Sequence, residues 1–327
     1  MNSIEVSHLK KNFFVFQKEP GVLGSFKSVF SRRYKEIKAV RDASFTIKEG
    51  ELIGFIGPNG AGKTTTLKCL SGLLYPDTGQ VSVLGFRPFE RKPEFQKQFA
   101  LVMGQKNQLW WDLPPMETFL LNKEIYGVPQ QQFKKTLDEL VEILEVRDIL
   151  KNQVRKLSLG QRMKCELIAA LLHSPKVLFL DEPTIGMDVI MQKKIRDFIK
   201  EYNLRYKATI ILTSHYMGDV KELCQRIIII DKGRLVFDGQ LNKIIKRYAE
   251  HKILSVILSK KIDQEKLSIF GQLTDYNFPE VKFIIDKKKI AEASGRILST
   301  LPVVDINIEE PPIEEIIRDL FTNKNYQ

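Results

Sequence analysis

Long hydrophobic runs are what this sequence of 327 residues most clearly lacks. Its most apolar stretch, "RIIIIDKGRLVF", is interrupted by charge after four isoleucines, whereas a membrane-spanning helix needs about 18 to 20 apolar residues in a row. The opening "MNSIEVSHLKKNFF" also lacks the pattern of a secretory signal peptide. If the protein acts at a membrane, we therefore expect a different chain to cross it.

Cysteine is also scarce. The sequence has three cysteines, Cys69, Cys165 and Cys224, which lie far apart and form no CxxC pair. An odd, scattered set argues against a disulfide framework and fits a reducing compartment. We expect all three to be small apolar residues of the core.

Acidic residues are outnumbered, with 40 Asp and Glu against 51 Lys and Arg, a formal net charge of +11. This balance favours an anionic partner: a nucleotide, a nucleic acid or an anionic membrane surface. A hydrophobic content of 43% and a charged content of 28% are typical of a globular chain. The length suits one large domain and a small one.

A glycine-rich loop gives the clearest functional signal. The stretch "GPNGAGKT" fits the phosphate-loop pattern G-x-x-x-x-G-K-[ST] without a mismatch, between the apolar run "ELIGFIG" and a helical pattern. In such a loop backbone N–H groups surround the phosphates, the lysine reaches the β- and γ-phosphates, and the hydroxyl of the next residue binds Mg²⁺. The predicted nucleotide-binding residues here are Gly57, Pro58, Asn59, Gly60, Ala61, Gly62, Lys63, Thr64 and Thr65.

Polar residues also follow two further apolar runs. Asp181 and Glu182 end "KVLFLDEP", and His215 ends "ATIILTSH". Continuous apolar runs are typical of central parallel strands, whose carboxyl ends form the ligand-binding edge of the sheet. We therefore expect Asp181 to hold Mg²⁺, Glu182 to polarise the attacking water and His215 to contact the γ-phosphate. An acidic pair at a strand end or a single histidine is commonly only structural, but here a complete phosphate loop precedes them.

The remaining patterns predict an α/β chain in two domains, residues 1–239 and 240–327. Residues 114–150 have a helical period, with Phe133, Leu137, Val141 and Leu144 on one face and a break at Gly127. The last 88 or so residues repeat short strand and helix signals, among them "ILSVIL", "VKFIID" and "VVDINIEE", and predict a small α+β domain.

A basic segment interrupts the first sheet. Residues 17–38 carry six Lys and Arg against two Glu, and Leu23, Phe26, Phe30, Tyr34 and Ile37 fall at helical spacing. The pattern predicts a short amphipathic helix inserted at a sheet edge. It could contact a membrane subunit or anionic headgroups, or simply pack on its own domain.

The stretch "LSLGQ" begins a second helix with the features of an anion site. Ser158 and Gly160 supply a small hydroxyl residue and a glycine at a helix start, where free backbone N–H groups point outward. Leu159 stands between them, and we expect ordinary helical or extended backbone angles there.

These residues resemble the nucleotide-binding subunit of ATP-binding cassette (ABC) transporters over about residues 4–239. The family's motifs occur in order, as "GPNGAGKTT", Gln105 in "LVMGQKNQLWWDLP", "LSLGQ", "VLFLDEP", "IGMD" and "TSHYM". The text around Gln105 and the short C-terminal domain are similar to ATPases of ABC-2 type exporters, whose permeases are separate chains. The resemblance implies a mostly parallel sheet core, an antiparallel β edge and a helical subdomain over about residues 106–172.

The resemblance also implies roles for matching residues. Gln105 would contact Mg²⁺ and the attacking water, Asp188 would face a dimer partner, and Phe13 would stack on adenine, with Phe14 as its adjacent alternative. The signature residues Ser158, Leu159, Gly160 and Gln161 would bind the ATP held by the partner chain.

The expected function is an ATPase with ATP and Mg²⁺ as its ligands, peripheral on the cytoplasmic face of the membrane. Two cassettes, in a homodimer, would bury two ATP molecules and drive multi-spanning permease subunits, and no nucleic acid partner is expected. Two alternatives stay open: an importer ATPase with a regulatory C-terminal domain, and a non-transport ABC ATPase that acts on nucleic acid or ribosomes.

Overall fold

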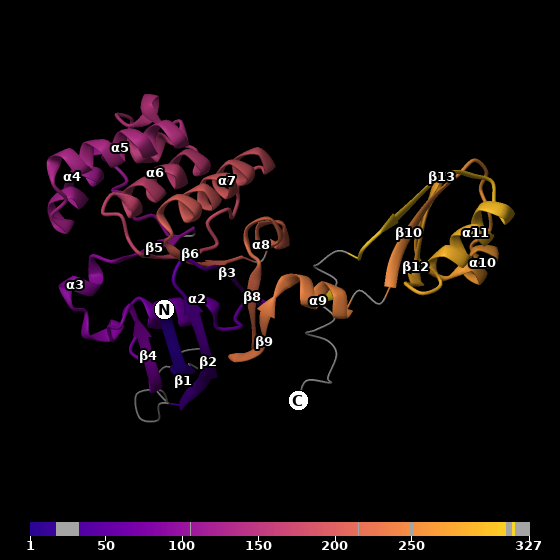
Figure 1. Cartoon of the computed structure of the whole chain (residues 1–327), viewed down its shortest axis with the longest axis horizontal. Helices are drawn as coiled ribbons and strands as arrows, with labels where there is room; N and C mark the ends of the chain where they lie inside the picture. The colour runs from indigo at the N-terminus through magenta and orange to yellow at the C-terminus, as the bar shows by residue number, and fades with distance from the viewer. Residues whose placement is uncertain (18–32, 105, 215, 249–250, 312–315, 318–327) are drawn as a thin grey trace, which may run out of the picture. The chain divides into compact units, whose positions relative to one another are not determined.

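Strand β3 (Leu52–Ile56) lies near the middle of the larger of two sheets, and its apolar residues explain why. Ile53, Phe55 and Ile56 are each at most 1% exposed, as expected for a strand with packing on both faces. The computed structural model describes residues 1–17, 33–104, 106–214, 216–248, 251–311 and 316–317. It divides the chain into two compact units, Met1–Gly239 and Gln240–Gln327 (Figure 1).

The first unit contains a nine-stranded sheet in the order β4-β1-β2-β9-β8-β3-β7-β6-β5. Strands β8, β3, β7, β6 and β5 are parallel neighbours, so their carboxyl ends share one edge. Among the other four strands, β1 pairs in antiparallel fashion with β2 on one side and with β4 on the other. The bounds are β1 Asn2–Gln17, β2 Arg33–Lys48, β4 Thr78–Val83, β5 Phe99–Met103, β6 Val177–Asp181, β7 Thr209–Thr213, β8 Arg226–Asp231 and β9 Arg234–Gln240.

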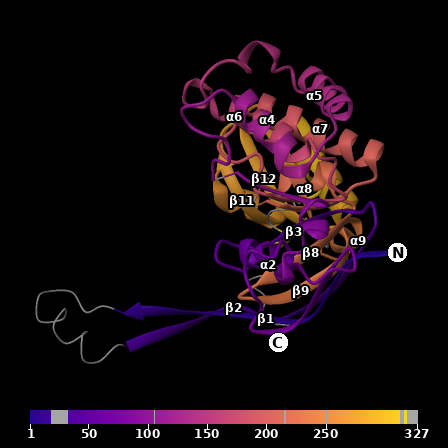
Figure 2. The same ribbon diagram turned by 90° about the vertical axis from the view of Figure 1, so that its left-hand side faces the viewer.

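The antiparallel arm corrects the prediction for the basic segment. Tyr34 and Ile37, predicted to lie on a helix, belong to β2, where they pair with Phe16 and Phe13 of β1. The prediction was wrong there because cross-strand pairing, which sequence periodicity does not reveal, continues the ladder out to Gln17 and Arg33. Figure 2 shows these two strands extending together beyond the rest of the sheet. Residues 18–32, including Leu23, Phe26 and Phe30, lie outside the described residues.

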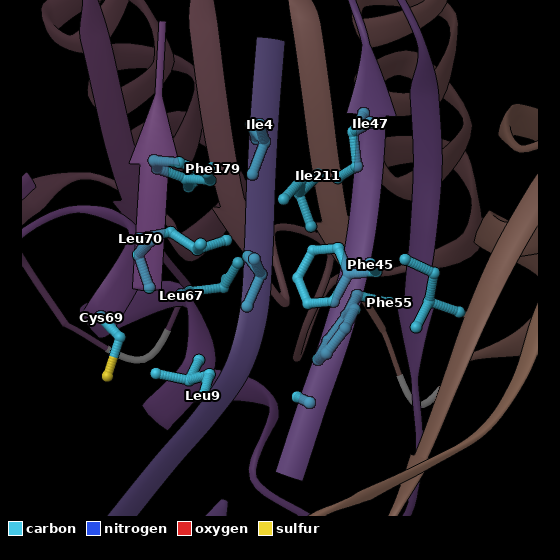
Figure 3. Close-up of a cluster of buried hydrophobic side chains, with 14 of the residues drawn as sticks. Ile4, Leu9, Phe45, Ile47, Phe55, Leu67, Cys69, Leu70, Phe179 and Ile211 are labelled. Atoms are coloured by element: carbon cyan, nitrogen blue, oxygen red, sulfur yellow. The ribbon is translucent and has the colours of Figure 1, made fainter. Parts of the chain in front are cut away.

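A single apolar cluster joins the antiparallel arm to the parallel strands and to α2 (Lys63–Leu70). Figure 3 shows side chains of this cluster meeting between the two layers; those labelled are Ile4, Leu9, Phe45, Ile47, Phe55, Leu67, Cys69, Leu70, Phe179 and Ile211. All three cysteines are buried and free of disulfides, which confirms their predicted place in the core. This packing fixes the start of α2, and with it the phosphate loop, against the sheet.

The helices of the first unit include a group that follows β5. Helix α5 buries the predicted face of Phe133, Leu137, Val141 and Leu144, and α4 ends at Gly127 with a φ of 65°. Contacts join α4 and α5 to α6, and α5 to α7 (Figure 1). The bounds are α3 Pro93–Gln96, α4 Pro115–Tyr126, α5 Gln130–Leu144, α6 Leu159–Leu171, α7 Val189–Tyr206 and α8 Met217–Leu223.

The second unit has a separate antiparallel sheet in the order β11-β12-β10-β13. Its core-facing residues include Leu254, Val256 and Phe283, which pack with Leu267 and Ile297 from α10 and α11. The bounds are α9 Leu241–Tyr248, β10 His251–Leu258, α10 Gln264–Leu267, β11 Gln272–Asn277, β12 Glu280–Asp286, α11 Ile290–Thr300 and β13 Val303–Glu309. Across the described residues of both units, the helices are too short or too polar for any of them to span a bilayer.

Candidate functional site: a phosphate loop at the carboxyl edge of the sheet

The phosphate loop connects β3 to α2 and depends on two glycines. Gly62 has a φ of 109°, and a Cβ there would lie 2.4 Å from the carbonyl oxygen of Ala39. A Cβ on Gly57 would lie 2.1 Å from the carbonyl oxygen of Ile230. Any larger side chain would push the loop away from the neighbouring strands, so glycine sets the close fit of the loop against β2 and β8.

Lys63 lies across this loop rather than in solvent. Its Nζ donates hydrogen bonds to the carbonyl oxygens of Gly57, at 2.7 Å, and Pro58, at 3.1 Å. The residue is 6% exposed, and burial lowers the pKa of its ammonium, an effect that the nearby carboxylates of Glu182 and Asp181 oppose. The lysine is therefore held at the loop, where its charge can meet phosphate oxygens.

The carboxylate of Asp181 joins the start of α2 to the end of β7. Its Oδ2 accepts a hydrogen bond from the Thr64 hydroxyl at 2.8 Å, and its Oδ1 accepts one from the Thr213 hydroxyl at 2.6 Å. Among the described residues there is no group of three or more His, Cys, Asp or Glu able to hold a metal. Mg²⁺ that accompanies a nucleotide uses one or two protein ligands together with phosphate oxygens and water, so Thr64 and Asp181 are a suitable oxygen donor set.

Glu182 follows Asp181 in a strained backbone conformation. Its φ is 54°, in the left-handed region that non-glycine residues rarely adopt. Its backbone N–H donates to the carbonyl oxygen of Thr213 at 3.0 Å and to the Thr213 hydroxyl at 3.1 Å. A Cβ on Gly104 would lie 2.1 Å from the Glu182 carbonyl oxygen, so this glycine is needed where the two segments touch.

These groups line one cavity of about 1200 Å³. Phe13 lines it too, opposite Ile37 in the β1–β2 ladder, whereas Phe14 is 69% exposed and not among the lining residues. The walls of the cavity are strongly basic, because these Lys and Arg residues line it: Lys35, Lys38, Arg41, Lys63, Lys68, Lys106 and Lys232. The cavity thus offers an aromatic ring at one place, a phosphate loop at another, and positive charge for an anion.

Two predicted site residues, Gln105 and His215, lie outside the described residues. Their neighbours are described: the Gly104 N–H donates to the Asp181 carbonyl oxygen at 2.8 Å, Lys106 lines the cavity, and Ser214 is 2% exposed. These described neighbours lie at the carboxyl ends of β5 and β7 or beside the cavity.

The signature residues form a helix start that is separate from this cavity. Ser158 caps α6: its Oγ accepts from the Gln161 N–H at 3.2 Å, and the Gln161 side chain accepts from the Ser158 N–H at 3.0 Å. Leu159 is the first helical residue and has no positive φ, so its backbone is ordinary, as expected. Ser158, Leu159, Gly160 and Gln161 are all absent from the residues that line the cavity.

Asp188 starts the next helix. Its carboxylate accepts a hydrogen bond from the Met191 N–H at 2.9 Å, which makes it the N-cap of α7. Val189 and Ile190, which follow it, are 70% and 74% exposed.

Sequence reasoning missed a buried network below the site. Asp219 on α8 is fully buried and accepts hydrogen bonds from Thr184, which follows Glu182, and from Ser214, which precedes His215. Arg196 on α7 neutralises it, with 3.0 Å between its Nη1 and an Asp219 oxygen. The same reasoning missed Thr213. The only signal was a polar residue in an otherwise apolar stretch, and that does not identify its partners.

Fold and cavity together define a phosphate-loop nucleotide-binding protein. A family model described as "ABC transporter" matches residues 40–185, and one described as "EvrA-like ABC transporter, C-terminal domain" matches residues 250–309. The chain is 31% identical to the ABC transporter ATP-binding protein NatA of Bacillus subtilis (strain 168), over 71% of this chain and 94% of that protein. It is 29% identical to the linearmycin resistance ATP-binding protein LnrL of the same organism, over 88% of this chain and 95% of that protein.

A solved structure supports the fold. It is a dimeric ATP-binding cassette in a post-hydrolysis state with ADP and Pi, with a TM-score of 0.61 and 21% identity, and the match covers 73% of this chain and 98% of that one. The chain belongs to the family of ABC transporter ATP-binding proteins. It is an ATP-binding, ATP-hydrolysing subunit. These matches confirm the family, the fold class and the activity expected from the sequence.

The lowered pKa of Lys63 predicts how ATP affinity depends on pH. Phosphate binds the charged ammonium, so affinity should fall as pH rises through the pKa of Lys63 in the free protein, below the ordinary value of 10.5. Titrating ATP binding between neutral and alkaline pH measures this. Lys63→Arg, whose guanidinium stays charged, should lack that fall, and Lys63→Ala should weaken binding by about 10- to 100-fold. Undiminished affinity in Lys63→Ala would contradict the assignment.

Proposed function

We propose that this chain hydrolyses Mg·ATP in a dimer of two cassettes that drives separate membrane-spanning permease subunits in export. The observation that carries the proposal is the separation of two half-sites. Lys63, Thr64, Asp181 and Glu182 share one cavity, whereas the Ser158 helix start is not part of it. This separation supports an ATP site that is completed by the signature residues of a second chain.

In this proposal the cavity orients ATP for attack. Phe13 would stack on the base, the loop N–H groups and Lys63 would hold the β- and γ-phosphates, and Thr64, Asp181 and Gln105 would hold the Mg²⁺ ion. The metal supplies neutralisation of charge on the phosphate oxygens. Phe13 is favoured over Phe14 because Phe13 lines the cavity.

Glu182 acts as the general base. It takes a proton from the water as the water oxygen attacks the γ-phosphorus, the bond to the β-phosphate oxygen breaks, and ADP leaves with that electron pair. His215 stabilises the charge on the γ-phosphate. Support for Glu182 comes from its position in the cavity beside Asp181 and from the contacts that hold its backbone.

The partner chain completes the site. Ser158 and Gly160 of one chain hydrogen-bond the γ-phosphate of the other, and Asp188 with its exposed neighbours lies at the dimer surface. Hydrolysis removes the phosphate that bridges the chains, and the dimer opens. The Ser158 hydroxyl can donate to phosphate while its oxygen caps α6, because a hydroxyl is both donor and acceptor.

Export is favoured over import by two observations. The loop text "MGQKNQLWWDLP" is similar to exporter ATPases of the ABC-2 type, and the relative that matches 88% of this chain is named for linearmycin resistance. The permeases would hold the cassettes at the cytoplasmic face of the membrane. Residues 240–327 would serve as an accessory domain.

Glu182→Gln tests the role of the base. The variant should bind ATP with near wild-type affinity, because the amide is isosteric, but its kcat should fall by about 100- to 10,000-fold. With hydrolysis blocked, closed dimer should accumulate in the presence of Mg·ATP. ATPase assays and size-exclusion chromatography measure both. Wild-type turnover would remove Glu182 from the proposed role.

Mixing two inactive variants tests the shared site. Lys63→Ala removes the lysine that holds the phosphates and should abolish hydrolysis, and Ser158→Arg blocks the signature helix start. A mixed dimer has one intact pair, Lys63 of one chain with Ser158 of the other, so an equal mixture should recover up to about a quarter of wild-type activity. Each variant alone, checked for folding by circular dichroism, is the control. No recovery above the separate rates would count against sites shared between chains.

A further inference from the structure

A buried glutamate on α6 holds a loop that starts at the catalytic edge. Glu166 is 3% exposed, and its Oε1 accepts hydrogen bonds from the backbone N–H groups of Gln108, at 2.8 Å, and Leu109, at 3.2 Å. Leu109 is itself only 3% exposed. Neither the motifs nor the steps of hydrolysis account for an acidic residue at this place.

The residues just before this loop contact the backbone of Asp181 and Glu182. The Gly104 N–H donates to the Asp181 carbonyl oxygen at 2.8 Å, and the Gly104 Cα lies against the Glu182 carbonyl. The Lys106 N–H then donates to the Met103 carbonyl oxygen at 3.0 Å. Displacement of the loop would therefore disturb the backbone beside Asp181 and Glu182.

The far end of the loop is tied to the residues around the signature turn. The carbonyl oxygens of Trp111 and Leu113 accept from the N–H groups of Arg155, at 3.0 Å, and Val154, at 3.1 Å. The guanidinium of Arg162 lies 5.6 Å from the centre of the Trp111 ring, within the range of a cation–π contact. The loop thus contacts the chain on both sides of Ser158, and Glu166 holds the buried stretch between these contacts and the catalytic edge.

Burial of this carboxylate is costly. Burial raises the pKa of Glu166, opposed by the two backbone hydrogen bonds and by Arg162, and Oε2 has no hydrogen-bond partner within the described part of the chain. An apolar side chain would avoid that cost, but it would leave the N–H groups of Gln108 and Leu109 without this acceptor. The contact with the loop is therefore what the carboxylate supplies.

We propose that Glu166 is a positioning residue for ATP hydrolysis: it makes residues 106–113 move as one body with α6. The inference rests on the proposed function, in which Ser158 at the start of α6 meets the ATP of the partner chain. Through Glu166, the approach of α6 to that nucleotide is coupled to the placement of the loop at the chain's own catalytic edge.

Three variants of the full chain test this coupling. Glu166→Ala removes the acceptor, Glu166→Gln keeps an amide oxygen that can accept both N–H groups, and Cys165→Ala truncates the neighbouring buried residue of the same helix as a control. Glu166→Ala should bind ATP within about twofold of wild type, because Glu166 is not a cavity residue, while its kcat falls about tenfold or more. Glu166→Gln and Cys165→Ala should keep most of the wild-type kcat.

Hydrogen exchange reads the contact directly. The amides of Gln108 and Leu109 should exchange faster in Glu166→Ala and remain protected in Glu166→Gln. Wild-type kcat in Glu166→Ala despite faster exchange would overturn the proposal. The proposal would also be overturned if all three variants lost kcat equally and in proportion to their loss of stability. If Glu166→Ala does not fold, Glu166→Met fills similar volume without the acceptor, and a wild-type kcat in that variant overturns the proposal.

Glu182→Gln, assayed in parallel, separates this inference from the proposed function. If Glu182→Gln turns over like wild type, the proposed mechanism fails. If Glu182→Gln is inactive while Glu166→Ala and Glu166→Met both retain wild-type kcat, only the positioning role of Glu166 fails.

Discussion

The nucleotide site depends on the carboxylate of Asp181, which accepts hydrogen bonds from the hydroxyl groups of Thr64 and Thr213 on two other segments of the chain. Thr64 lies in the first turn of α2 and Thr213 ends β7; the parallel register of β6 and β7 places Asp181 opposite Thr213. The register of β5 and β6 pairs Met103 with Asp181 and so brings Gly104 to this edge. A slip of one residue in β6 would turn Asp181 to the other face and separate all three segments.

Bringing these segments together requires an unfavourable backbone conformation at Glu182. A left-handed conformation at a non-glycine residue costs about 1–2 kcal/mol, so the surrounding contacts must impose it. Thr213 binds the Glu182 N–H on one side, and buried Asp219 binds Thr184 just beyond it. Because Asp219 also binds Ser214, one carboxylate keeps Thr184 and Ser214 at a fixed separation.

Local signals in the sequence identified the parallel strands, the phosphate loop and the start of α6, because each is encoded in consecutive residues. The apolar run before Gly57 and the face beginning at Phe133 needed no knowledge of distant segments. The helix predicted through Tyr34 and Ile37 was wrong because that strand is specified by its partner, β1. The roles of Glu166 and Asp219 were not predicted for the same reason. In the sequence each is a single charged residue on a helix, and only the fold supplies the N–H or hydroxyl groups that it binds.

Glu166 and Asp219 address one physical problem in two places. A loop that crosses between a sheet and a helix leaves backbone and hydroxyl donors outside any ladder, and buried donors must find acceptors. A carboxylate on a helix provides a strong, directional acceptor and also fastens the loop to that helix. Asp219 is neutralised by Arg196, which suits a rigid support, whereas Glu166 keeps one oxygen without a partner among the described residues. The two carboxylates therefore fasten loops in the same way at different cost: Asp219 has an ion pair, whereas Glu166 is offset by two backbone hydrogen bonds and the nearby charge of Arg162.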